Sequence, residues 1–111
     1  MTTSPAGALP QGTLDLLVLR TLAAGPRHGY GIARWIEETT DDVLSVEEGS
    51  LYPALYRMEQ RGWIAATWTR SELGKDIKRY ALTAAGRTQL RARTAEWGAL
   101  AHAVGKILRA R

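Results

Sequence analysis

The chain has 111 residues, of which 45% are hydrophobic, so we expect one domain with a buried core and no separate catalytic domain. It contains no cysteine, which excludes disulfides, thiolate catalysis and cysteine-ligated zinc. The net charge of +4 is uneven, because residues 1–60 hold 8 acidic and 4 basic side chains whereas residues 61–93 hold 2 acidic and 8 basic ones. This basic second half suits a polyanion such as DNA, although a solvated surface can have the same composition.

The N-terminal part begins with residues 1–10, which have no hydrophobic periodicity and are expected to form a flexible tail. Thr13 is a candidate N-cap for a first helix that ends at Gly25 and Pro26. Apolar residues occupy nearly every face of this helix, which predicts burial on most sides. Asp15 is unusual there, and we expect it to face solvent or to cap a neighbouring group.

A second helix is predicted over residues 28–40, with His28 at its start and an apolar stripe formed by Ile32, Trp35 and Ile36. Residues 43–46 (Val-Leu-Ser-Val) form a short apolar run that we interpret as a single β-strand.

A third helix is predicted over residues 48–61. Its core side carries apolar residues at i, i+4 and i+7, namely Leu51, Leu55 and Met58. Pro53 is tolerated only near a helix start, so the helix is expected to begin just before it.

Two β-type runs follow over residues 63–69 and 78–83, and the polar segment between them predicts a hairpin with a long loop. Thr83 is then a candidate N-cap for a last helix from Ala84 to about Leu108. This helix carries apolar residues spaced by seven: Leu90, Trp97 and Val104. No later element covers such a stripe, so the helix is expected to need a partner.

This order of elements predicts a mainly α (α+β) fold, a winged helix-turn-helix with a long C-terminal dimerisation helix. We assign residues 1–10 to the flexible tail, 11–83 to the winged-helix DNA-binding domain and 84–111 to the dimerisation helix. In this fold the third helix enters a DNA groove and the hairpin is the wing.

The polar side of the third helix has hydrogen-bonding groups suited to DNA. Ser50, Tyr52 and Tyr56 carry hydroxyls for phosphates or base edges, and Arg57 can neutralise a phosphate or bind guanine through two hydrogen bonds. The helix start near Pro53 offers free backbone N–H groups to a phosphate. An ordinary amphipathic surface helix has the same pattern, and this segment alone does not decide between the two.

The predicted wing carries four basic side chains suited to phosphate or minor-groove contact: Arg70, Lys75, Lys78 and Arg79. Glu72 and Asp76 dilute this charge, so a solvated hairpin is the alternative.

Four segments in the same order resemble the PadR family of transcriptional regulators. They are residues 11–17 (QGTLDLL), 25–32 (GPRHGYGI), 48–62 (EGSLYPALYRMEQRG) and 80–86 (YALTAAG). The resemblance covers about residues 9–108, and its third segment is highly specific.

The resemblance implies a winged-helix domain, a homodimer built by the C-terminal helix, and repression from a palindromic operator, often relieved by a small molecule. Some members of the family respond to phenolic acids or hydrophobic drugs. The family's tyrosines and basic residue in the third helix match Tyr52, Tyr56 and Arg57. The wing departs from the family pattern, because Asp76 and Ile77 interrupt the basic run, so we expect weaker contacts there.

Trp97 resembles a tryptophan that stacks on flat aromatic drugs at the dimer centre in one branch of the family. The alternative is that Trp97 only packs in the dimer interface, where tryptophan is a common anchor. The candidate effector or interface residues are Leu90, Trp97, Leu100, Ala101 and Val104.

The resulting prediction is a homodimeric, cytoplasmic repressor that binds a pseudo-palindromic double-stranded operator and is released by a small aromatic effector. The alternative is a winged-helix module that binds protein. An enzyme is not expected, because the sequence has no nucleophile–base pair, metal cluster or glycine-rich phosphate loop. His28 and His102 are far apart in sequence, and neither a metal nor a cofactor is expected. The lack of a membrane-spanning run and of a secretory signal pattern is the basis for the expected compartment.

Overall fold

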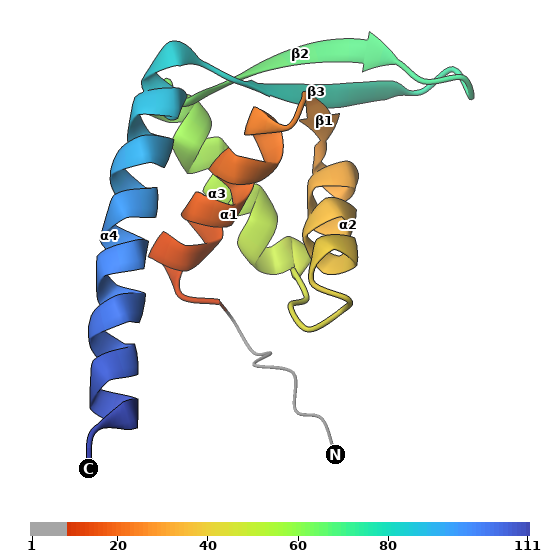
Figure 1. Cartoon of the computed structure of the whole chain (residues 1–111). Helices are drawn as coiled ribbons and strands as arrows, with labels where there is room; N and C mark the ends of the chain where they lie inside the picture. The colour runs from red at the N-terminus through yellow and green to blue at the C-terminus, as the bar shows by residue number, and fades with distance from the viewer. Residues whose placement is uncertain (1–8) are drawn as a thin grey trace.

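The computed structural model describes residues 9–111, which form four helices and a three-stranded antiparallel sheet (Figure 1). The elements in chain order are α1 (Gln11–Ala23), β1 (Arg27–His28), α2 (Gly29–Thr39), α3 (Glu48–Gln60), β2 (Ile64–Arg70), β3 (Asp76–Leu82) and α4 (Ala84–Arg109). The strand order is β1-β3-β2, so β1 pairs with β3 on the side opposite β2. In this described part of the chain, no helix is both long and apolar enough to cross a membrane.

Helix α1 begins three residues earlier than predicted, because its N-cap is Pro10 and not Thr13. Pro10 precedes it, with a φ of −53°, and its carbonyl accepts a hydrogen bond from the backbone N–H of Leu14 at 3.0 Å. The fixed φ of proline suits a helix start, and Pro10 occupies the N-cap position. Thr13 therefore lies inside the helix. Of the predicted tail, residues 1–8 lie outside the described residues, and Leu9 packs against the core.

Helix α2 follows a strand that we did not predict. His28 is the N-cap, as expected for a residue at the helix start, and its Nδ1 accepts a hydrogen bond from the backbone N–H of Gly31 at 3.2 Å. Arg27 and His28 also pair with Tyr80 and Arg79 of β3. A strand of two residues has no hydrophobic alternation of its own, so only its pairing with β3 defines it.

The strand predicted over residues 43–46 does not form. Asp41 and Asp42 have positive φ values of 50° and 63°, so the chain reverses direction directly after α2. The backbone N–H groups of Leu44 and Val46 then donate to side-chain oxygens of α2 and its C-cap. Both side chains pack against the core from a loop, which explains their apolar character without a strand.

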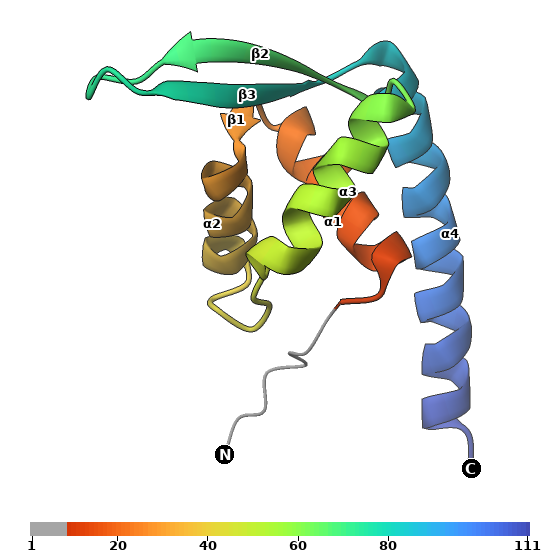
Figure 2. The ribbon, with the colours of Figure 1, turned by 180° about the vertical axis from the view of Figure 1, so that it is seen from behind.

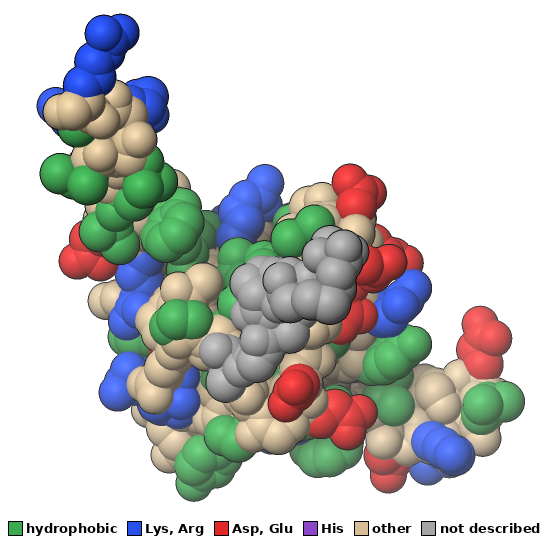
Figure 3. Space-filling view, turned by 90° about the horizontal axis from the view of Figure 1, so that it is seen from below, with side chains coloured by type: hydrophobic (Ala, Val, Ile, Leu, Met, Phe, Trp, Pro, Cys, Tyr) green, Lys and Arg blue, Asp and Glu red, His purple; other side chains and the backbone are tan. Residues whose placement is uncertain are grey.

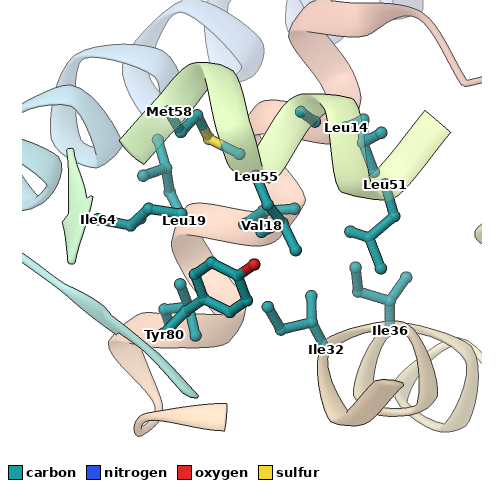
Figure 4. Close-up of a cluster of buried hydrophobic side chains, with 12 residues drawn as sticks. Leu14, Val18, Leu19, Ile32, Ile36, Leu51, Leu55, Met58, Ile64 and Tyr80 are labelled. Atoms are coloured by element: carbon teal, nitrogen blue, oxygen red, sulfur yellow. The ribbon is translucent and has the colours of Figure 1, made fainter. Parts of the chain in front are cut away.

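Apolar side chains from α1, α2, α3 and the sheet meet between α1 and α3 (Figure 4). The cluster contains Leu14, Val18 and Leu19 of α1, Ile32 and Ile36 of α2, Leu51, Leu55 and Met58 of α3, and Ile64 and Tyr80 of the sheet. The predicted core stripe of α3 is therefore confirmed, since its three members are at most 1% exposed. Burial of each such side chain contributes roughly 1.5–3 kcal/mol, which holds α3 firmly on α1.

The hairpin is longer and its loop shorter than predicted. Strands β2 and β3 pair from Ile64–Leu82 to Arg70–Asp76, which leaves a loop of residues 71–75. The loop is closed by two hydrogen bonds between Ser71 and Lys75, whose backbone N–H donates to Oγ of Ser71 at 3.1 Å.

Helix α4 packs closely only along its first half (Figures 1 and 2). Thr83 caps it as predicted, because its Oγ1 accepts a hydrogen bond from the backbone N–H of Gly86 at 3.0 Å. A Cβ on Gly86 would lie 2.0 Å from the carbonyl oxygen of Trp63, so α4 can approach the sheet only with glycine here. Leu90 packs against the core, whereas every residue from 94 to 109 except Gly105 is exposed.

Candidate nucleic-acid interface

One side of α3 carries exposed tyrosine side chains. Tyr52 and Tyr56 lie one turn apart and are 44% and 64% exposed, and Gln60 follows one turn later. Figure 2 shows α3 crossing the front of the molecule below the hairpin. Because the opposite side of the helix is buried, this side has a fixed orientation, as groove reading requires.

A second side of α3 faces the start of α1. The half-buried Ser50, the exposed Pro53 and Arg57 line a cleft of about 210 Å³ together with Leu9 and α1 residues. Pro53 lies in the second turn of α3, which begins at Glu48 as predicted. The predicted DNA-binding residues of α3 therefore fall on two sides of the helix.

Arg57 extends towards α1 and not into solvent. Its Nη2 lies 2.5 Å from Oδ1 of Asp15, and its side chain is 25% exposed. Asp15 is 2% exposed, so the expectation that it faces solvent is wrong. A buried carboxylate requires a partner, and the ion pair with Arg57 explains an aspartate in this apolar helix.

The predicted wing residues differ in how free they are. Arg70, Lys75 and Arg79 are exposed. Arg70 lies 3.7 Å from Asp76 in an ion pair whose members are both about 70% exposed, which leaves its guanidinium accessible to another anion.

Lys78 is engaged within the chain. Its Nζ donates a hydrogen bond to Oε1 of Glu59 in α3 at 3.1 Å, and this contact raises the pKa of Lys78 above its usual 10.5. The ammonium also lies 5.9 Å from the ring centre of Trp68 and 5.6 Å from that of Tyr80. Lys78 therefore joins the wing to α3.

An aromatic cleft of about 590 Å³ separates the hairpin from α3 and the start of α2. Of its lining residues, only Tyr52 and Lys78 were predicted as part of the site. The aromatic lining residues that we did not predict are His28, Tyr30, Trp68 and Tyr80. Burial raises the pKa of Tyr80 above its usual 10.0. Among the residues we missed, Tyr30 is 64% and Trp68 68% exposed. Tyr30 lies beside a predicted helix start and Trp68 lies on a predicted wing strand. These positions were the sequence signals that could have identified both residues as part of the site.

The projecting half of α4 carries an exposed apolar stripe in the described part of the chain. Trp97, Leu100 and Val104 are 51%, 56% and 46% exposed, and Ala101 is exposed beside them. In Figure 3 hydrophobic side chains gather along the arm at the upper left, which ends in Lys and Arg side chains. Leu90 differs from the other candidates, because it packs against the core of its own chain. The start of α1 and α4 also enclose a cleft of about 250 Å³ lined by Trp97 and Leu100.

The two histidines lie in different parts of the fold. His28 caps α2, and His102 is exposed on α4. Within residues 9–111, no group of three His, Asp or Glu side chains is arranged to hold a metal ion.

Three packed helices followed by a hairpin, with α3 fixed by its apolar side and bordered by the hairpin, define a winged-helix protein of the DNA-binding class. The model of the transcriptional regulator PadR-like family matches residues 18–92. The chain therefore belongs to the PadR-like family of transcriptional regulators, and the family resemblance of the sequence is confirmed.

Relatives and solved structures agree with this assignment. An uncharacterized protein from Lysinibacillus sphaericus is 30% identical over 87 residues, which cover 78% of this chain and 80% of that protein. A transcriptional regulator from Clostridium thermocellum superposes with a TM-score of 0.82 at 27% identity, covering 89% of this chain and 96% of the other. A PadR-like transcriptional regulator from Bacillus cereus superposes with a TM-score of 0.77 at 29% identity, covering 91% and 96%.

Proposed function

We propose that the protein is a homodimeric transcriptional repressor that binds a pseudo-palindromic operator. The observation that carries this proposal is the fixed, hydroxyl-bearing side of α3, formed by Tyr52 and Tyr56, beside a hairpin with exposed basic side chains. Hydroxyl groups on a rigid helix can bind base edges and phosphates, and basic side chains on a wing bind the backbone.

The proposed contacts divide between the two elements. Tyr52 and Tyr56 would enter the major groove with α3, and the α3 start at Ser50 and Pro53 would approach a phosphate. The three exposed basic residues of the wing, Arg70, Lys75 and Arg79, would neutralise phosphates. Lys78 would contribute mainly by holding the wing to α3 through Glu59.

The apolar stripe of α4 supports the homodimer. Trp97, Leu100 and Val104 remain about half exposed on α4 among residues 9–111. Two copies of this stripe can bury each other in a symmetric interface. The two α3 helices would then reach successive major grooves about 34 Å apart.

An effector site is proposed where Trp97 meets the start of α1. The cleft of about 250 Å³ there offers an aromatic ring and apolar walls to a planar ligand. A ligand that binds one dimer geometry better than another would shift the spacing of the α3 helices. Titration with an aromatic acid such as 4-hydroxybenzoate or a hydrophobic dye, followed by Trp fluorescence and operator affinity, tests this; no change with either probe would speak against the site.

The experiment that tests the main proposal starts with a footprint on the DNA upstream of the protein's own gene. The protected duplex is then titrated by fluorescence anisotropy between 50 and 300 mM salt, where we expect log Kobs to fall by about 0.9 per phosphate neutralised for each unit of log salt. Binding that is absent, or that does not depend on salt, would contradict DNA recognition. Lys75→Gln is expected to reduce the slope by about one phosphate, and Arg111→Gln, which removes a charge two residues after the end of α4, serves as its control.

A protein-binding module is the second candidate, because the hairpin also exposes apolar side chains. Leu73 at its tip is 85% exposed and Trp68 is 68% exposed. This alternative predicts that Tyr56→Ala changes no DNA affinity, whereas the repressor predicts a clear loss.

A further inference from the structure

Helix α3 is tied by an ion pair on each flank. Arg57 pairs with Asp15 of α1, and Glu59 pairs with Lys78 of β3. Two of the basic side chains that the sequence predicted to hold DNA are therefore already bound to carboxylates of their own chain. The two pairs connect the helix to the body of the domain on one side and to the wing on the other.

We infer that Arg57 is a positioning residue: its guanidinium fixes the rotation of α3 on α1 through Asp15 and does not itself bind DNA. This inference rests on the proposed function and assigns a role within the same interface. It replaces the sequence-based expectation that Arg57 neutralises a phosphate or binds guanine.

The burial of Asp15 is the first argument. This carboxylate is 2% exposed, and Arg57 is its ion-pair partner. If the guanidinium turned outwards to a phosphate, a carboxylate that is 2% exposed would stay buried without its partner, which is strongly unfavourable. For Arg57, pairing with the buried Asp15 is therefore favoured over pairing with a solvated DNA phosphate.

The second argument is that the Arg57–Asp15 bond adds a directional constraint to the apolar packing that holds α3 on α1. Hydrophobic contacts such as those of Leu55 and Met58 have no directional preference. A charge-assisted hydrogen bond fixes two atoms at a short distance and has strong angular requirements. The Arg57–Asp15 bond can thus set the rotation that decides where Tyr52 and Tyr56 point.

The third argument is the state of the guanidinium itself. Its Nε is buried and has no hydrogen-bond partner among residues 9–111, while Nη2 holds Asp15. A side chain whose donor is enclosed within the protein has little freedom to reach outwards. Arg57 therefore differs from Arg70 and Lys75, which are exposed on the wing.

The test compares Asp15→Asn, Arg57→Gln and their double variant on the footprinted operator duplex, at a temperature where circular dichroism shows each variant to be folded. We expect each single variant to weaken binding about tenfold, which corresponds to about 1.4 kcal/mol, and the double variant to be no weaker than either one. The slope of log Kobs against log salt should equal that of the wild type, because no phosphate contact is lost. Lys75→Gln provides the comparison in which the slope does change.

Several results would overturn the inference. One is an Asp15→Asn variant that binds as tightly as the wild type while Arg57→Gln loses both affinity and about 0.9 of the slope, since Arg57 would then contact a phosphate. Another is a pair of folded variants with lower melting temperatures but unchanged operator affinity, which would show a purely structural role.

Arg57→Lys keeps the inference testable if Asp15→Asn does not fold. Lysine can still neutralise a phosphate but lacks the planar fork of arginine, so we expect weaker binding with an unchanged slope. Affinity equal to that of the wild type would overturn the inference. A wild-type protein without salt-dependent operator binding would instead refute the proposed function, which separates the two failures.

Discussion

Replacing Leu100 by Gln should dissociate the proposed homodimer while leaving the fold of each protomer intact. Leu100 is 56% exposed on the uncovered half of α4, so a partner would bury about half of its side chain. Full burial of a leucine is worth roughly 1.5–3 kcal/mol, so the loss of half is about 1 kcal/mol. Burying an amide without a hydrogen-bond partner costs about another 1 kcal/mol.

The symmetry of the interface doubles this effect. A dimer with a twofold axis contains two copies of Leu100, so the expected loss is about 4 kcal/mol, or about a thousandfold in the dimer dissociation constant. Sedimentation equilibrium over a range of concentrations measures this constant. Thermal melts of the variant show whether the protomer remains folded.

Leu73→Gln is the matched control. Leu73 is 85% exposed at the wing tip, far from the stripe, and its replacement should leave the dimer constant unchanged. A Leu100→Gln variant that remains dimeric at the same concentrations as the wild type would refute the reasoning, because the apolar stripe would then not be the interface.

Three further predictions follow from close contacts and burial. Gly29→Ala would place a Cβ 2.7 Å from the hydroxyl of Tyr52 and displace that ring, so operator affinity should fall about tenfold. In the control variant Gly31→Ala, the new Cβ would meet only contacts of 3.5 Å or more, and the protein should bind normally. Equal affinities of the two variants would argue against a DNA contact by Tyr52. Gly86→Ala would place a Cβ 2.0 Å from a backbone carbonyl oxygen, so the free energy of unfolding in urea should drop by about 2–3 kcal/mol, and a drop below about 0.5 kcal/mol would disprove the close approach of α4. Burial raises the pKa of Tyr80, so the folded state keeps this proton to higher pH than the unfolded state. The contribution of Tyr80 to stability should therefore be constant up to about pH 10 and fall above it. Tyr80→Phe should make the alkaline fall in stability less steep, and an equally steep fall in both proteins would contradict this cause.

Local patterns predicted the helices well because the signals lie within a few residues. The spacing of Leu51, Leu55 and Met58 identified the buried side of α3, and Thr83 identified the start of α4. Elements that depend on distant partners were not predicted. Strand β1 exists only through its pairing with β3, and the apolar residues after α2 pack from a loop although their types favour a strand.

The candidate site shows the same division. The exposed tyrosines of α3 could be placed from helical periodicity, because this depends on residues three or four apart. The ion pair of Arg57 with Asp15 joins positions 42 residues apart, and that of Lys78 with Glu59 joins positions 19 apart. Sequence spacing cannot indicate such pairs, which is why Arg57 and Lys78 were expected to be free for DNA.

The measurement that tests the central claim most directly is a hydroxyl-radical footprint of the protein on the upstream DNA of its own gene, with the wild type and Tyr56→Phe side by side. We expect two protected stretches about one helical turn apart, and markedly weaker protection when the Tyr56 hydroxyl is removed. Thr39→Ala, which removes an exposed residue's hydroxyl at the end of α2, should protect the DNA as the wild type does. The absence of protection, or the same protection by Tyr56→Phe and the wild type, would contradict DNA reading by α3.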